Sequence, residues 1–390
     1  MIPHRAVQSL PSSRREFMRG VAIGAAAVCS SEPVFAAWQE SRKHSQVPVP
    51  SVHDRLRSEA AAAPLRMQFR GETAAECREW QTAFRAKLLE LLGNQTPPLK
   101  WHVEREAEHR KSDHVREEFV LTAAGVPAVP LHVLRPINTP GPWPAVLCVH
   151  GHGPFGHDAV AGKDDDAEIA RAIAESNYDY ARQLVRRGFL TAAPCLTPFG
   201  RRLGDREPYG KQDPCAVTFI RMQLLGHVLM GQNLRDLLWT IEYLRSRTDV
   251  RADQIGCVGL SYGGRMTMLT AAADPRVKVA VVSGALNTMQ ERVGTHYSCG
   301  AQVIPGLLQF GDVPEIGSLI APRPCLWEVG SRDNLIDPHW ADIALGRMNR
   351  AYAALSAGEN LRVDRFDGGH RWHGVEALDM LRTALGPTNP

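Results

Sequence analysis

The chain has 390 residues, of which 44% are hydrophobic and 22% are charged, and its formal net charge is +3. This length and composition suffice for a sizeable core and fit one large α/β domain with additions. A charge so close to neutral gives no footprint for nucleic acid or for an anionic membrane surface.

Residues 1–36 have the organisation of an export signal. The pair Arg14-Arg15 precedes a short, weakly apolar run over residues 20–28, and Val34-Phe35-Ala36 offers small residues at the −3 and −1 positions of a signal-peptidase cut. This organisation resembles a bacterial Tat signal. We therefore expect a periplasmic or secreted protein, whose formal net charge without residues 1–36 is +1.

A membrane anchor is not expected in the mature chain. Cys29 is a poor lipoprotein cysteine because the bulky Val28 precedes it. No other stretch approaches the roughly 18 apolar residues of a membrane span. We expect residues 37–100 to form an N-terminal extension with one helix, and residues 101–390 to form the catalytic domain.

The extension begins polar and rich in proline, so residues 37–70 are predicted to be extended. Residues 73–92 are predicted to be helical. Thr73 and Glu76 have capping-box spacing, an apolar stripe follows, and Gly93 ends the pattern.

Beyond the extension, residues 115–135 alternate in polarity and predict two antiparallel strands that turn at Ala124-Gly125-Val126. Apolar runs that predict buried strands then alternate with amphipathic runs that predict helices. The predicted strands are 143–150, 189–195, 255–259, 277–283, 323–330 and 361–366, and the predicted helices are 177–187, 234–247, 265–273, 338–355 and 373–385.

This alternation predicts an α/β fold with a mostly parallel central sheet and helices on both faces. The reactive loops of such a sheet gather at the carboxyl ends of its strands. Residues 196–233 and 285–313 fit the rhythm poorly, and we expect them to be loop insertions over the active site.

The cysteines point to packing rather than to a metal. Cys148, Cys257 and Cys325 lie inside apolar runs and are expected to be buried free thiols. Cys215 and Cys299 lie in loop-like regions, where pairing is open. No CxxC pair and no Cys/His spacing suggests zinc, so neither a metal nor another cofactor is expected.

The stretch Gly259-Leu260-Ser261-Tyr262-Gly263 is a Gly-x-Ser-x-Gly sequence between a predicted strand and a predicted helix. This is the pattern of a nucleophile elbow. The turn is so tight that Gly259 and Gly263 have no room for a Cβ atom. We expect the Ser261 hydroxyl to project at a helix N-terminus and to act as a nucleophile.

A serine nucleophile needs a base, and the base needs a group that orients it. Asp333 and His370 each follow a later predicted strand, and Ser261, Asp333, His370 is the chain order of α/β-hydrolases. Asp337 is the alternative acid, but its place before Pro338 suits a helix cap. His373 is the alternative base, but it falls where the last helix is expected to begin.

The oxyanion of the tetrahedral intermediate needs two hydrogen-bond donors. We expect them to be the backbone N–H groups of Tyr262 and of His152, the latter in the loop His150-Gly151-His152-Gly153. A metal site formed by His150, His152 and His157 is disfavoured because no carboxylate has a convincing spacing. The run Asp164-Asp165-Asp166 is expected to be a solvated loop and helix start.

Several of these features together resemble the dienelactone-hydrolase-like group of bacterial α/β-hydrolases, close to acetyl xylan esterases. The resemblance covers most of the mature chain and rests on the elbow, His150-Gly151-His152-Gly153, Asp274-Pro275-Arg276-Val277 and Ala321-Pro322-Arg323-Pro324 leading to Gly330-x-x-Asp333. It implies ester hydrolysis through an acyl-serine, with Asp333 as acid and His370 as base. Dienelactone hydrolases proper use a cysteine nucleophile, so their substrate is not implied.

The leading functional hypothesis is an exported serine esterase for short acyl or methyl esters, including those of carbohydrates. Tyr262 and Trp372 would suit stacking on a sugar, or would pack the pocket wall. Ser261-Tyr262-Gly263-Gly264 also looks like prolyl-oligopeptidase-type peptidases, although the residues before Pro144 are too few for their β-propeller. The third hypothesis is a non-catalytic hydrolase fold used for binding. The oligomeric state is open.

Overall fold

The computed structural model describes residues 51–204, 210, 212–296 and 298–386. The chain divides into two compact units, residues 1–55 and residues 56–390. The expected export signal, residues 1–36, lies outside the described residues. Within the described part, no helix is long and apolar enough to cross a membrane. All of the predicted catalytic residues belong to the second unit.

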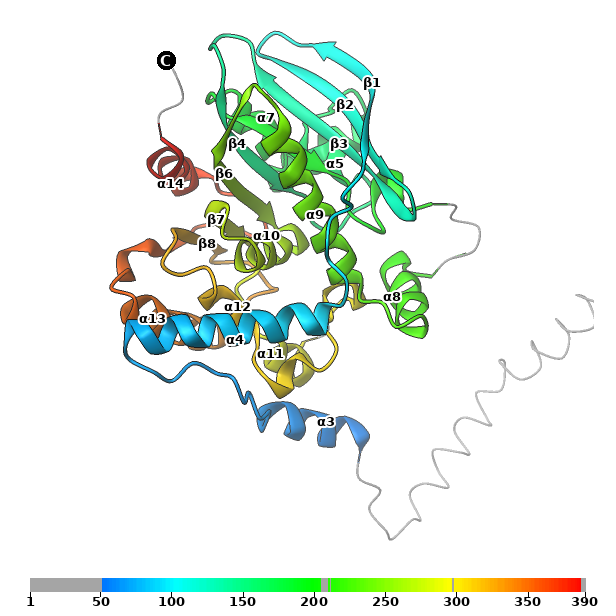
Figure 1. The fold of residues 1–390 in the computed structure, drawn as a ribbon. Helices are drawn as coiled ribbons and strands as arrows, with labels where there is room; N and C mark the ends of the chain where they lie inside the picture. Colours follow the sequence, from blue (N-terminus) through cyan, green and yellow to red (C-terminus); the bar gives the residue numbers. More distant parts are fainter. Residues whose placement is uncertain (1–50, 205–209, 211, 297, 387–390) are drawn as a thin grey trace, which may run out of the picture. The chain divides into compact units, whose positions relative to one another are not determined.

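The second unit is built on a nine-stranded sheet with the strand order β1-β2-β3-β5-β4-β6-β7-β8-β9 (Figure 1). The pairs from β1 to β3, and β3 with β5, are antiparallel, and all later pairs are parallel. The strands are β1 (His102–Arg110), β2 (His114–Ala123), β3 (Val126–Pro136), β4 (Trp143–Val149), β5 (Leu190–Pro194), β6 (Val250–Leu260), β7 (Val277–Ser283), β8 (Cys325–Gly330) and β9 (Leu361–Phe366).

Helices cover both faces of the sheet, which confirms the predicted fold class. Successive residues of a strand point to opposite faces, and β4 accordingly supplies Ala145 and Leu147 to one apolar core and Val146 and Cys148 to the other. The first core includes α4 (Ala74–Leu92), α9 (Leu229–Ser246), α10 (Tyr262–Ala273), α12 (Val313–Ser318) and α13 (Pro338–Ala354). The second includes α5 (His157–Val160), α7 (Tyr180–Val185) and α14 (Val375–Leu385).

Local signals placed most of these elements correctly. Helix α4 begins after Thr73, whose side chain forms the predicted capping box with Glu76, and Gly93 ends it. The predicted hairpin is β2 and β3, which turn around Gly125. Asp166 caps α6 (Ala167–Ser176), as expected for the acidic run.

The N-terminal extension differs from the prediction of one helix between residues 37 and 100. A second helix, α3 (Val52–Ala61), lies where an extended lead-in was expected.

Strand β1, which follows the extension, was also not predicted. Eight of its nine residues are exposed, because it is the edge strand of the sheet and lacks the apolar face that marks an interior strand.

The two segments expected to be loop insertions contain short helices. Residues 196–233 include α8 (Pro214–Leu224), which Asp213 caps, and the start of α9. Residues 285–313 include α11 (Met289–Gly294) and the 3-10 turn η3 (Gly300–Gln302).

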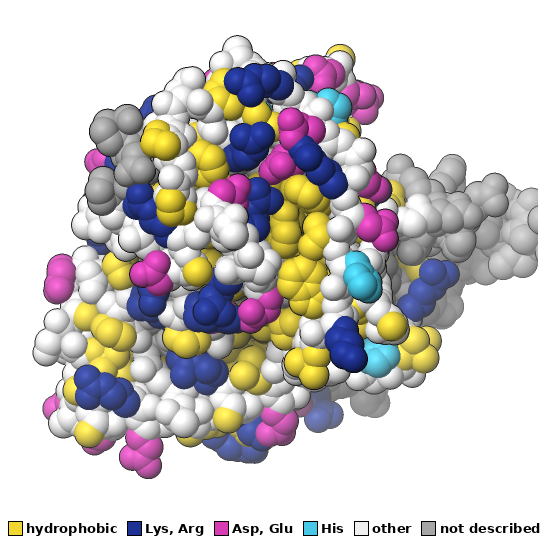
Figure 2. Space-filling view, turned by 45° about the horizontal axis from the view of Figure 1, so that its top comes forward, with side chains coloured by type: hydrophobic (Ala, Val, Ile, Leu, Met, Phe, Trp, Pro, Cys, Tyr) yellow, Lys and Arg dark blue, Asp and Glu magenta, His cyan; other side chains and the backbone are white. Residues whose placement is uncertain are grey.

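On the face drawn in Figure 2, basic and acidic side chains are interspersed around a hollowed strip of hydrophobic side chains. That mixture agrees with a nearly neutral chain.

Candidate active site

Ser261 occupies a strained turn between β6 and α10. Its backbone has φ 63° and ψ −122°, a conformation that residues other than glycine rarely adopt. A Cβ atom at Gly263 would lie 1.9 Å from the carbonyl oxygen of Val149, and one at Gly259 would lie 2.5 Å from Gly263. The two glycines therefore let the turn close. The Ser261 N–H donates to the carbonyl of Ser283, at 2.9 Å, which ties the turn to β7.

Asp333 and His370 lie on the loops that follow β8 and β9, and the structure brings them together. The Nδ1 atom of His370 is 2.7 Å from Oδ2 of Asp333. The other Asp333 oxygen accepts a hydrogen bond from the N–H of Leu335 at 2.9 Å. Asp333 is only 6% exposed, so its hydrogen bonds are shielded from water. This arrangement fixes the orientation of the imidazole.

The two loops are also joined through their backbones. The N–H of Ser331 donates to Phe366, and the N–H of Arg332 donates to Gly368, at 2.9 and 2.8 Å. Gly330 approaches the His370 loop so closely that a Cβ atom there would lie 2.4 Å from the carbonyl oxygen of Gly369. The relative position of Asp333 and His370 is thus set by main-chain contacts.

Glu328, on β8, holds the far end of the His370 loop. Its carboxylate accepts hydrogen bonds from the N–H groups of Gly374, at 2.7 Å, and His373, at 3.3 Å. Burial raises the pKa of Glu328 to about 7, against the opposing effect of these hydrogen bonds. This residue was not predicted, because a lone glutamate inside an apolar strand looks like any other strand residue.

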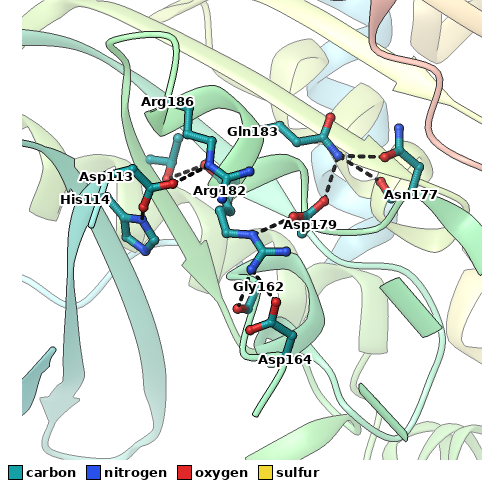
Figure 3. Close-up of polar contacts among 11 residues, drawn as sticks. Asp113, His114, Gly162, Asp164, Asn177, Asp179, Arg182, Gln183 and Arg186 are labelled. Carbon is teal, nitrogen blue, oxygen red and sulfur yellow. Dashed lines mark hydrogen bonds and ion pairs between the residues drawn. The ribbon is translucent and has the colours of Figure 1, made fainter. Parts of the chain in front are cut away.

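A polar network outside the sheet supports the same loop. Asn177 donates from Nδ2 to the carbonyl of Trp372 at 3.0 Å. Gln183 donates to the Asn177 side chain at 2.8 Å (Figure 3). Gln183 and Arg182 both contact Asp179, at 2.7 and 2.6 Å. The network therefore links α7 to the residues just after His370.

Ser261 and His370 line one cavity of about 690 Å³. The imidazole lies over Gly284, where a Cβ atom would be 2.8 Å from its Cε1. The Nε2 atom of His370 is buried and has no hydrogen-bond partner among the described residues. Most of the remaining wall comes from residues 213–216 and 285–302. The two predicted insertions thus line the cavity that contains Ser261.

The same cavity contains a buried cation that was not predicted from the sequence. Arg265 is 2% exposed, and one of its guanidinium nitrogens donates to Oδ1 of Asn287. The other two, Nε and Nη1, have no hydrogen-bond partner within the described chain. Burial, with a contribution from Arg292, lowers the pKa of Arg265 to about 10. The arginine follows the serine by one helical turn, which is the spacing that could have revealed it.

His152 and Tyr262 flank Ser261 from two sides. Tyr262 is the first residue of α10, and His152 lies in the loop after β4 and lines the cavity. The N–H of Gly151 donates to the hydroxyl of Tyr178 at 2.5 Å. A Cβ atom at Gly151 would lie 3.1 Å from the Cβ of Ser261. The loop therefore passes directly beside the serine.

The aromatic side chains considered for sugar stacking are not available for it. Tyr262 is fully buried, and its hydroxyl accepts a hydrogen bond from Asn233 at 2.7 Å. Trp372 is 2% exposed and packs against Tyr180. The stacking interpretation was wrong, because both rings fill the core behind the cavity.

The alternative acid and base have other partners. Asp337 caps α13, where it accepts from the N–H of His339 at 2.9 Å. His373 has Nδ1 2.6 Å from Oδ2 of Asp364.

His150, considered above as a metal ligand, is buried between Gly151 and Leu196, whose backbone groups form hydrogen bonds with both ring nitrogens. Burial lowers the pKa of His150 to about 4.

Known proteins resemble this chain in sequence and in fold. The model of the dienelactone hydrolase family matches residues 135–295. The Bacillus subtilis (strain 168) protein named "Putative hydrolase YtaP" is 32% identical over 294 residues, which are 73% of this chain and 92% of that protein.

Solved structures share the fold at lower identity. A protein of Bacteroides fragilis NCTC 9343 described as a putative acetyl xylan esterase superposes with a TM-score of 0.67 at 19% identity, over 82% of this chain and 83% of its own. The glucuronoyl esterase from Solibacter usitatus gives a TM-score of 0.60 at 15% identity, over 87% and 99% of the two chains. The chain thus has the α/β-hydrolase fold, belongs to the dienelactone hydrolase family and is a carboxylic ester hydrolase.

Proposed function

We propose that this hydrolase is an exported serine esterase that cleaves acyl or methyl esters of carbohydrates through an acyl-enzyme. In this mechanism the hydroxyl of Ser261 attacks the ester carbonyl, and His370 accepts the hydroxyl proton at Nε2. Asp333 holds the imidazole in the required tautomer and stabilises it when it becomes charged. His370 then donates the proton to the leaving alcohol, and water releases the acyl group by the reverse sequence.

The observation that carries this proposal is the short contact between Asp333 and His370 beside Ser261. The 2.7 Å contact occupies Nδ1 of His370 and directs the unpartnered Nε2 away from Asp333. Ser261 and His370 also line the same cavity. A base with one nitrogen fixed by a carboxylate and the other available is what a serine nucleophile requires.

Charge on the tetrahedral intermediate would be stabilised by two backbone donors. The N–H of Tyr262 points out of the N-terminus of α10, where the helix dipole favours negative charge. The N–H of His152 belongs to the loop after β4, which passes beside Ser261 at Gly151. Among the described residues, neither N–H is used in a hydrogen bond, which supports their assignment as the oxyanion hole.

Carbohydrate esters suit the cavity and agree with the names of similar proteins. About 690 Å³ is within the range of pockets that enclose a small ligand. Its lining combines the polar side chains of Asn287 and Gln302 with the guanidinium of Arg265. Acetyl xylan and glucuronoyl esters are named for the structural relatives, and we propose the same broad class here.

The decisive experiment for the activity is an ester panel with a matched variant. Purified protein should hydrolyse p-nitrophenyl acetate, and one of acetylated xylan or methyl glucuronate esters should be hydrolysed better. Ser261→Ala should reduce kcat by roughly 10⁶-fold. Preferential release from aminoacyl-naphthylamides would favour a peptidase instead. Unchanged hydrolysis in Ser261→Ala would contradict the mechanism.

Export is proposed from the sequence of residues 1–36 alone. Cell fractionation of the full chain should place the protein outside the cytoplasm in a Tat-competent strain and inside it in a strain without the Tat translocase. Equal export by both strains would refute the Tat assignment.

A further inference from the structure

A second cluster of reactive side chains lies in the wall of the cavity. The imidazole of His152 and the thiols of Cys215 and Cys299 have ligand atoms that all lie within 4.8 Å of one another. The three residues come from the loop after β4, from α8 and from the residue that caps η3. His152 and Cys299 line the cavity that contains Ser261, and His152 and Cys215 line an adjoining hollow of about 290 Å³.

Both sulfur atoms are of a type that binds metals. Sγ of Cys299 accepts a hydrogen bond from the N–H of Ala301 at 3.4 Å. The thiolate is the form of cysteine that binds a metal, so an ion here would displace the thiol protons.

The imidazole of His152 has an unused nitrogen. Its Nε2 atom is buried and makes no hydrogen bond within the described part of the chain. A buried polar atom without a partner is destabilising, so its position next to two sulfurs calls for an explanation. A disulfide between Cys215 and Cys299 would use both sulfurs and leave this nitrogen without a partner. A cation would use all three atoms.

We propose that His152, Cys215 and Cys299 bind a Zn²⁺ ion. Zinc prefers nitrogen and sulfur ligands in a tetrahedron, at about 2.0–2.1 Å from nitrogen and 2.3 Å from sulfur, which places ligand atoms roughly 3.5–3.8 Å apart. The ligand atoms lie within 4.8 Å of one another, so the side chains must draw together to reach that spacing. Binding releases the thiol protons of Cys215 and Cys299 to solvent, and the two thiolates then balance the charge of the ion.

A water would fill the fourth position of the tetrahedron. Asp213 lines both the cavity and the adjoining hollow, and its side chain contacts the thiol of Cys215. One of its oxygens caps α8 through the N–H of Ala216, at 3.0 Å, and its carboxylate is not part of the group of ligand atoms within 4.8 Å of one another. The ion would fasten α8 and η3 to the loop that also contains the proposed oxyanion donor.

Cobalt provides a direct test, because Co²⁺ replaces Zn²⁺ and reports its ligands by colour. Chelator-treated, reduced full-length protein should bind one Co²⁺ per chain. It should show thiolate-to-cobalt charge transfer in the near ultraviolet and the visible bands of a tetrahedral site, and Zn²⁺ should abolish both. Cys215→Ser and Cys299→Ser should each lose the charge-transfer intensity of one sulfur and bind more weakly. Cys77→Ser, which alters a buried thiol on α4, should match the wild type.

Alkylation of the wild-type protein provides a second measurement that needs no variant. Zn²⁺ should protect Cys215 and Cys299 from N-ethylmaleimide, as read from peptide masses, and should leave the labelling of other cysteines unchanged. Absence of the charge-transfer band in the reduced wild type, a band of full wild-type intensity in both cysteine variants, or equal labelling of Cys299 with and without Zn²⁺ would overturn the proposal. These readouts are independent of ester hydrolysis.

Discussion

The two sides of the cavity are built in different ways. The sheet side, with Ser261, Asp333 and His370, consists of turns that directly follow parallel strands and are fixed by main-chain contacts such as those between residues 330–332 and 366–369. The insertion side, with α8, α11 and η3, is joined through side chains of distant segments, such as Phe219 against Gly300. The ends of strands hold reactive groups in fixed positions, whereas loop insertions can change the shape of the cavity wall without disturbing the sheet. We therefore expect chemistry to depend on the first side and substrate binding on the second.

Among variants that keep both the fold and Ser261, the largest effect should come from removing the charge that orients His370. Asp333→Asn should lower kcat by roughly 10⁴-fold with little change in KM, because the amide favours the wrong tautomer of the imidazole. Steady-state kinetics on p-nitrophenyl acetate measures this. Asp337→Asn is the matched control and should keep near wild-type activity, since asparagine also caps a helix. If Asp337→Asn lost more activity than Asp333→Asn, the acid would be Asp337 instead of Asp333.

A methyl group added at Gly263 should destabilise the elbow and, with it, the folded protein. Gly263→Ala places a Cβ atom 1.9 Å from the carbonyl oxygen of Val149, and neither backbone segment can move without breaking the turn. We expect a loss on the order of 4 kcal/mol in unfolding free energy and no measurable hydrolysis. Gly346→Ala, in α13 where nothing lies within 4 Å, should instead gain about 0.5–1 kcal/mol. Denaturant unfolding compares the two.

The carboxyl of Glu328 should make stability depend on pH. Its folded pKa, about 7, lies above the unfolded value of about 4.3. Between these two pH values the folded state therefore binds more protons than the unfolded state. The free energy of unfolding of the wild type falls as the pH rises through this range. Glu328→Gln cannot titrate, so its stability relative to wild type should rise by about 3 kcal/mol from pH 4 to pH 7. A flat difference between Glu328→Gln and wild type would contradict the raised pKa.

The smallest effect should come from the insertion side. In Gly300→Ala the new Cβ atom would lie 2.8 Å from the Phe219 side chain, which can move and shift α8. We expect KM to rise and kcat to stay, with kcat/KM falling at most about tenfold, or about 1.4 kcal/mol. Gly294→Ala, with nothing within 4 Å, is the control. A loss in kcat with unchanged KM would contradict the division between the two sides.

The same division explains how much of the molecule was predictable. Strand ends carry local patterns, so the elbow, the positions of Asp333 and His370 and most strands were predictable from short stretches. Glu328 and Arg265 acquire their importance from burial next to distant segments, which no local pattern records. The cluster of His152, Cys215 and Cys299 is brought together by three segments without a recognisable metal-binding spacing. Strand β1 lacked an apolar face, and α3 lay in a proline-rich stretch where an extended chain was expected.

Ser261 is the proposed nucleophile, although dienelactone hydrolases proper use a cysteine there and Cys299 lines the same cavity. A fluorophosphonate probe should label the active protein once, and peptide mass spectrometry should place the adduct on Ser261. Heat-denatured protein should not react. An adduct on Cys299 or on another residue, or a folded, active enzyme that stays unlabelled, would contradict the assignment of Ser261.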